Sequence, residues 1–195
     1  MEPETGRVLT ALARSAVATS FAPRPPGARE LVAQAGGGPA LERRAATFVT
    51  LERDGTLRGC IGVLTALRPL GVDVVRNARA AARDPRLPPV APEEVPGLHV
   101  TVTVLSPAVP LRVNGFEELL AALRPGIDGL TLREGARRAT FLPSVWQGLP
   151  EPGRFVAALL RKGGWPRRLW ARGVRTAAWP EGLAAEHYTG ESFSA

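Results

Sequence analysis

The spacing of apolar residues predicts several amphipathic helices along the chain. Leu9, Leu12, Ala16 and Val17 recur at the helical period and predict a helix over about residues 5–19. The same spacing predicts further helices over about 69–82, 117–123 and 152–162. Each of these helices has one apolar face and therefore needs another element to pack against.

Alternation of apolar and polar residues predicts strands between these helices. Residues 47–51 alternate, Asp54-Gly55 is a hairpin-type turn, and residues 56–63 return as the partner strand. Two further segments, a strand over 98–105 and a second hairpin over 129–143, show the same pattern. Hairpins are thus predicted in both halves of the chain, with helices inserted between them.

This order of elements predicts an α+β fold with a largely antiparallel or mixed β-sheet and flanking helices. A chain of 195 residues is expected to form a single domain over 1–195. Two unequal lobes around a cleft are compatible with that length. The proline- and glycine-rich breaks at 21–40 and 84–97 are candidate lobe boundaries, and the segment 84–96 is expected not to be helical.

The composition limits the chemistry that is available. The single cysteine, Cys60, excludes an intrachain disulfide, and with two distant histidines it supplies no clustered metal site. We therefore expect no metal and no cofactor, and a free thiol in a reducing compartment. No run reaches the roughly 18 apolar residues of a membrane span, and no signal segment begins the chain, so a cytoplasmic location is expected.

The net charge of +7 is compatible with an anionic partner, but it is weak evidence for one. Lys162 is the single lysine among 25 basic residues, and the arginines are scattered rather than gathered in one block. Arginine in place of lysine is also what GC-rich coding produces. Nucleic-acid binding is therefore the least favoured of the hypotheses considered below.

The strongest candidate for chemistry is the segment LRGCIG at 57–62. On a regular strand the side chains of Arg58 and Cys60 leave the same face, about 6.6 Å apart, and a guanidinium favours the reactive thiolate over the thiol. Gly59 and Gly62 would let a substrate or another strand approach the backbone. In the alternative interpretation, the glycines relieve crowding at a bulge and Cys60 is a small core residue.

A second candidate segment is DPRLPPV at 84–90. Asp84 and Arg86 are expected to line a cleft that faces Cys60, since exposed loop residues often carry function. An ion pair between the two, or an ordinary turn after a helix, explains them equally well.

The segments LRGCIG, DPRLPPV and GIDGLTLREGARRATFLPSVW (126–146) together resemble the AMMECR domain family, also called AmmeMemoRadiSam system protein A. The likeness runs from about 47 to 165, and the tail from 176 onward departs from the family pattern. The resemblance implies an α/β or α+β fold with two unequal lobes. It also implies association with a Memo-like protein and a radical-SAM protein, but no established reaction.

Three hypotheses follow for function. The first is an enzyme or accessory enzyme that uses Cys60 with Arg58 on a small or peptide-borne substrate, with Gly59, Gly62, Asp84 and Arg86 in the binding site. The second is a non-catalytic recognition module that binds the Memo-like or radical-SAM partner, or a modified peptide. The third is a nucleic-acid-associated regulator.

Overall fold

The computed structural model describes residues 3–195 and confirms an α+β fold with an antiparallel sheet. The chain divides into two compact units. Unit 1 comprises the chain up to Leu105 together with Glu191–Ala195, and unit 2 comprises Ser106–Gly190. The last strand contributes residues to both units, so unit 1 is completed by a segment that is distant in sequence, whereas unit 2 is continuous.

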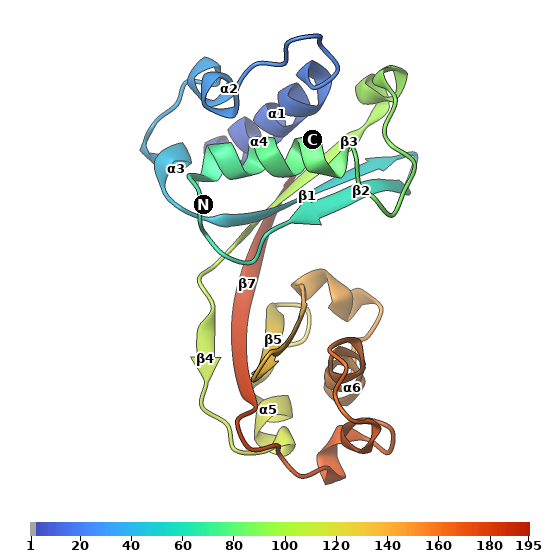
Figure 1. Ribbon diagram of the computed structural model, residues 1–195. Coiled ribbons are helices and arrows are strands. Elements are labelled where there is room, and N and C mark those ends of the chain that lie inside the picture. The colour runs from blue at the N-terminus through green and yellow to red at the C-terminus, as the bar shows by residue number, and fades with distance from the viewer. Residues whose placement is uncertain (1–2) are drawn as a thin grey trace. The chain divides into compact units, whose positions relative to one another are not determined.

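Unit 1 is a helix-covered sheet. Its elements are α1 (Pro3–Thr19), α2 (Ala28–Gln34), α3 (Pro39–Glu42), β1 (Ala46–Arg53), β2 (Thr56–Gly62), α4 (Leu70–Ala81), the 3₁₀ helix η1 (Pro92–Gly97), β3 (His99–Leu105) and the end of β7 (Ala184–Ser194). Strand β1 lies between β2 and β3, and both pairings are antiparallel. Helices α1 and α4 pack against the same face of this sheet (Figure 1).

Unit 2 contains a second antiparallel arrangement. Its elements are β4 (Val109–Leu111), α5 (Phe116–Ala122), β5 (Asp128–Glu134), β6 (Arg137–Phe141), η2 (Pro143–Gln147), α6 (Pro152–Lys162), η3 (Arg167–Leu169), η4 (Val174–Thr176) and the first part of β7. Strand β5 pairs with β6 on one side and β7 on the other, and β4 pairs with β7. Helix α6 buries Phe155, Val156, Leu159 and Leu160, the apolar face that its sequence spacing predicts.

The predicted hairpin of unit 1 forms, with one irregularity that affects the candidate site. Asp54 and Gly55 both adopt positive φ, as the tight turn requires. Farther along the strands, Leu51 pairs with Gly59 whereas Glu52 pairs with Leu57, so Arg58 is an extra residue in β2. This β-bulge interrupts the alternation of side chains along β2.

Two sequence expectations need correction, the absence of helix in 84–96 and the candidate boundaries at 21–40 and 84–97, and the structure adds helix α2 and strand β7 where no element was predicted. The segment 84–96 is not free of helix, because Pro92 begins η1 and the Glu94 carboxylate accepts a hydrogen bond from the Ala91 N–H at 2.8 Å. The break at 21–40 contains helix α2. The unit boundaries do not lie at 21–40 or 84–97, since both segments contribute buried side chains to the core of unit 1. The divergent tail, to which no strand was assigned, forms β7.

Gly59 is required by the close approach of α4 to β2. A Cβ atom at this position would overlap the backbone carbonyl of Ala81, at the end of α4. A backbone atom cannot move aside as a flexible side chain can, so any larger residue must displace the helix from the strand.

We therefore expect Gly59→Ala to lower the free energy of unfolding by about 1–3 kcal/mol, the usual cost of overpacking. Urea unfolding of the wild type and the variant measures the difference. Gly27→Ala is the matched control, because a Cβ atom there meets nothing within 4 Å. Equal losses in the two variants would contradict the packing explanation.

Candidate functional site

Cys60 lies on the edge strand of the unit 1 sheet, and both of its backbone groups are held by the loop that follows α4. The Asp84 Oδ2 atom accepts the Cys60 N–H at 3.0 Å, and the Arg86 Nη2 atom donates to the Cys60 carbonyl at 2.9 Å. An edge strand otherwise leaves these groups unpaired on one side. The two side chains therefore replace a neighbouring strand at this position; we call this set of contacts the Asp84–Arg86 clamp.

The clamp is internally paired. Arg86 donates through Nε to Asp84 Oδ1 at 2.9 Å and through Nη2 to Asp84 Oδ2 at 2.6 Å, and its own N–H also binds Asp84 Oδ1. The hydrogen bond from the Arg86 side chain, followed by the one from the Cys60 N–H, holds the pKa of Asp84 well below its ordinary value. The Asp84 side chain is fully buried, whereas that of Arg86 is 65% exposed.

The chain places Asp84 correctly because α4 ends just before it. The Asp84 N–H binds the carbonyl of Ala81, and the Val90 N–H returns to the carbonyl of Ala82 at 2.9 Å. This folds the proline-rich segment 84–90 back against the helix end. Asp84 and Arg86 therefore lie next to Cys60, and each binds its backbone.

The Cys60 side chain is half-buried and belongs to a cross-strand pair with Thr50. The Thr50 hydroxyl donates a hydrogen bond to the Cys60 Sγ at 3.3 Å. The hydrogen bond to Asp84 is the main cause of the raised pKa of Arg86, and a weaker electrostatic interaction with Cys60 adds to it. A hydroxyl donor and a guanidinium therefore both lie near the sulfur.

The Arg58 side chain is committed to a different partner. Its Nε and Nη2 atoms bind the two carboxylate oxygens of Glu94 at 2.8 and 2.9 Å, a bidentate pair. The hydrogen bond from Arg58 is the main reason why the pKa of Glu94 falls to about 2. Arg58 thus ties the bulge of β2 to η1, and the cation whose charge acts on Cys60 is Arg86.

The two glycines of the segment serve close packing. Gly59 faces the end of α4, as described above, and a Cβ atom at Gly62 would overlap the Phe48 ring and the Thr47 carbonyl. The structure thus brings Cys60, Asp84 and Arg86 into direct contact. Gly59 and Gly62 lie on the same strand as Cys60, whereas Arg58 is paired with η1.

Two contributing residues, Thr50 and Glu94, were not singled out from the sequence. Thr50 was not detectable, because the Asp-Gly turn alone places Val49 opposite Cys60, and the bulge at Arg58 shifts the register by one residue. Glu94 was not detectable either, because the contact with Arg58 joins residues 36 positions apart. Within residues 3–195, no group of three or more His, Cys, Asp or Glu side chains is arranged to hold a metal ion. Nor does any helix in this range have the length and apolarity of a membrane span.

The sequence was compared with known families and proteins. The AMMECR1 family model matches residues 10–181. A protein from Methanothermobacter thermautotrophicus is 44% identical over 105 residues, which cover 53% of this chain and only 54% of that protein. A protein from Thermofilum pendens is 31% identical over 189 residues, which cover 89% of this chain and 85% of that protein.

The fold was compared with solved structures. The crystal structure of an uncharacterized protein from Pyrococcus horikoshii matches with a TM-score of 0.80 at 30% sequence identity. The match covers 100% of this chain and 93% of that one. The fold is therefore shared along the whole chain, including the divergent tail.

The depressed pKa of Asp84 predicts a pH-dependent contribution to stability. Its carboxylate stabilises the folded state at pH values above the unfolded pKa, near 3.9, and this contribution is lost as the pH falls toward the folded value. We expect Asp84→Asn to lower the free energy of unfolding by about 1–3 kcal/mol at neutral pH, because buried hydrogen bonds to a charged group are lost. The difference from the wild type should shrink below about pH 4.

Urea unfolding between neutral and acidic pH measures this difference. Asp54→Asn is the control, since the Asp54 side chain is 93% exposed. A gap between wild type and Asp84→Asn that stays constant down to acid pH would show that the charge of Asp84 does not support the clamp.

Proposed function

The chain belongs to the AMMECR1 family, and from this premise we propose that it is a recognition module whose binding surface is formed by Cys60 and Arg86. The observation that carries the proposal is the division of roles around the clamp. Asp84 is buried and holds the backbone, Arg58 and Glu94 are paired with each other, and the exposed side chain among these charged residues is that of Arg86.

Such an arrangement suits recognition because the surface is fixed before a partner arrives. The Cys60 backbone is held on its free side by two hydrogen bonds, and Arg86 is held by a bidentate pair that leaves most of its side chain exposed. Preorganised side chains lose little conformational freedom on binding. A partner with an acidic group opposite Arg86 and an apolar contact over Cys60 fits this surface.

The proposed partners are a Memo-like protein and a radical-SAM protein. They come from the resemblance of LRGCIG, DPRLPPV and the 126–146 segment to AmmeMemoRadiSam system protein A. A cytoplasmic location is part of the same proposal, since it would keep Cys60 reduced.

Thiol chemistry at Cys60 is the second candidate, and two contacts favour it. The Thr50 hydroxyl donates to Sγ, while Arg86 supplies a positive charge near the sulfur. Hydrogen-bond donors and cations beside a cysteine are typical of sites that use the thiolate as a nucleophile. In this version Arg86 takes the role that the sequence analysis gave to Arg58.

Recognition through this surface predicts a specific pattern of binding losses. Arg86→Glu should weaken binding of the Memo-like protein, measured by calorimetry, by about tenfold or more, because the charge facing the partner is reversed. Arg24→Glu, a reversal at an exposed position elsewhere in unit 1, should leave binding unchanged. Cys60→Ser should retain binding. It should also retain any activity of the system reconstituted from this chain with the Memo-like and radical-SAM proteins. Full loss of activity in Cys60→Ser with intact binding would favour the enzyme instead.

The reactivity of the thiol separates the two candidates further. Alkylation of folded protein by iodoacetamide is followed against pH in the wild type, Arg86→Ala and Arg58→Ala. We expect the Arg86→Ala profile to differ from that of the wild type, because Arg86 is the guanidinium that contacts Cys60, through its carbonyl. The Arg58→Ala profile should move less, since Arg58 is paired with Glu94. The opposite order of shifts would return the activating role to Arg58.

A further inference from the structure

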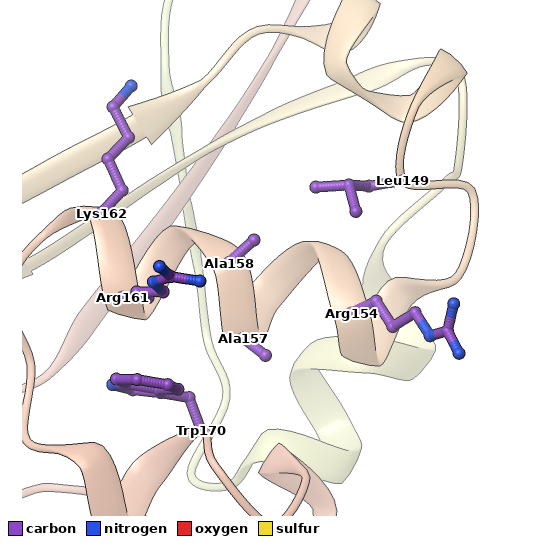
Figure 2. Close-up of a pocket in the computed structure, with 7 residues that line it drawn as sticks. All are labelled: Leu149, Arg154, Ala157, Ala158, Arg161, Lys162 and Trp170. Atoms are coloured by element: carbon purple, nitrogen blue, oxygen red, sulfur yellow. The ribbon is translucent and has the colours of Figure 1, made fainter.

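Unit 2 carries a groove over the outward face of α6 that does not involve the Cys60 surface. Leu149 and Trp170 form its walls, and Ala157 and Ala158 form its floor (Figure 2). Its volume is about 610 Å³, within the range of ligand-binding clefts. The Trp170 ring is fixed by a hydrogen bond from its Nε1 to the Trp165 carbonyl at 3.0 Å.

The floor consists of small residues and has a cationic side chain at each end. Arg154, Ala157, Ala158 and Arg161 follow one another at i, i+3, i+4 and i+7, so the two arginines are about 10 Å apart along the helix axis. The Arg161 guanidinium lies 6.0 Å from the centre of the Trp170 ring. The Lys162 side chain extends away from Trp170 and donates to the Thr140 carbonyl, so it contributes less to the groove (Figure 2).

A second hollow of about 480 Å³ continues from the first and shares Arg154, Ala157 and Trp170 with it. It adds Arg172 and Arg175, both exposed. The acidic side chain on its lining, Glu151, accepts the N–H groups of Gly153 and Arg154 at 2.8 and 2.7 Å at the start of α6, and it also interacts electrostatically with Arg175 and Arg154. The continuous surface is therefore cationic around an apolar floor; we call it the α6 groove.

These cations differ from the arginines that bind carboxylates within the fold. Arg58, Arg86 and Arg124 each bind a carboxylate at 2.6–2.8 Å. Across residues 3–195, by contrast, no ion pair within 4.0 Å is formed by the four arginines of the groove, Arg154, Arg161, Arg172 and Arg175. An anionic ligand would supply the missing partners.

The spacing of the cations selects the kind of anion. A phosphate or a nucleotide is best held where several cations converge on one group. In the α6 groove the arginines are instead separated by an apolar floor, which matches carboxylates on both sides of apolar side chains. An amphipathic helix with acidic residues at i and i+7 and apolar residues at i+3 and i+4 has this pattern, and alanines in α6 allow it to approach closely.

We propose that the α6 groove binds an acidic amphipathic helix of a partner protein. Its leucine-type side chains lie on Ala157 and Ala158 between Leu149 and Trp170. Its carboxylates pair with Arg154 and Arg161, and further acidic residues reach Arg172 or Arg175. This inference goes beyond the proposed function, because it uses only residues of unit 2.

The test is a fluorescence anisotropy titration of the full chain with a labelled helical peptide. In this peptide two adjacent leucines are flanked by glutamates three residues away on either side, in an alanine background. Arg154→Glu and Arg172→Glu should each weaken binding by about tenfold or more. Affinity should also fall as salt is raised, because exposed ion pairs are screened.

Matched controls define the outcome. Arg112→Glu, the same charge reversal at an exposed position of unit 2 outside the groove, should bind like the wild type, and so should Arg24→Glu in unit 1. Peptides with glutamine for glutamate, or serine for leucine, should bind at least about tenfold more weakly. Equal binding of the glutamine peptide, or no effect of Arg154→Glu and Arg172→Glu, overturns the proposal. A single-stranded DNA oligonucleotide that binds more tightly than the peptide, and that loses this binding in Arg154→Glu and Arg172→Glu, would also overturn the proposal.

Discussion

The contact between the Asp84 carboxylate and the Cys60 N–H is the constraint on which the rest of the candidate site depends. A buried carboxylate is stable only when hydrogen bonds and an opposite charge compensate its lost hydration. Here the strand supplies one hydrogen bond and Arg86 supplies the charge. The same pair also occupies the free edge of β2. Removing either side chain would expose that edge and leave the other group without its partner.

A second buried carboxylate fixes the opposite end of α4. Asp73, in the first turn of the helix, accepts hydrogen bonds from the N–H and hydroxyl of Thr47 on β1, and Asn77 binds both residues. Helix α4 is therefore attached to the hairpin at its start through Asp73 and just beyond its end through Asp84. Apolar packing alone would allow the helix to slide along the sheet, whereas two directional contacts fix its position.

The elements of the fold were largely predictable from the sequence, because they rest on local patterns. Helix α6 has the predicted bounds, and the first hairpin turns at Asp54-Gly55 as expected. The site was only partly predictable. Cys60, Asp84 and Arg86 were correctly grouped, but the i, i+2 rule paired Cys60 with Arg58 because the bulge in β2 leaves no signal in the sequence. Strand β7 was missed for a related reason, since its partners lie far away in the chain.

The arginine-rich composition becomes interpretable once the partners of each guanidinium are known. The composition alone predicts only a positive net charge, which is consistent with GC-rich coding and with an anionic partner alike. In the fold, some arginines hold buried or half-buried carboxylates, as Arg86 holds Asp84 and Arg124 holds Asp128. Those arginines serve stability, because each compensates a carboxylate, although Arg86 keeps most of its side chain exposed. Within residues 3–195 the arginines of the α6 groove form no ion pair within 4.0 Å and surround an apolar floor, which is why we propose an acidic partner for them.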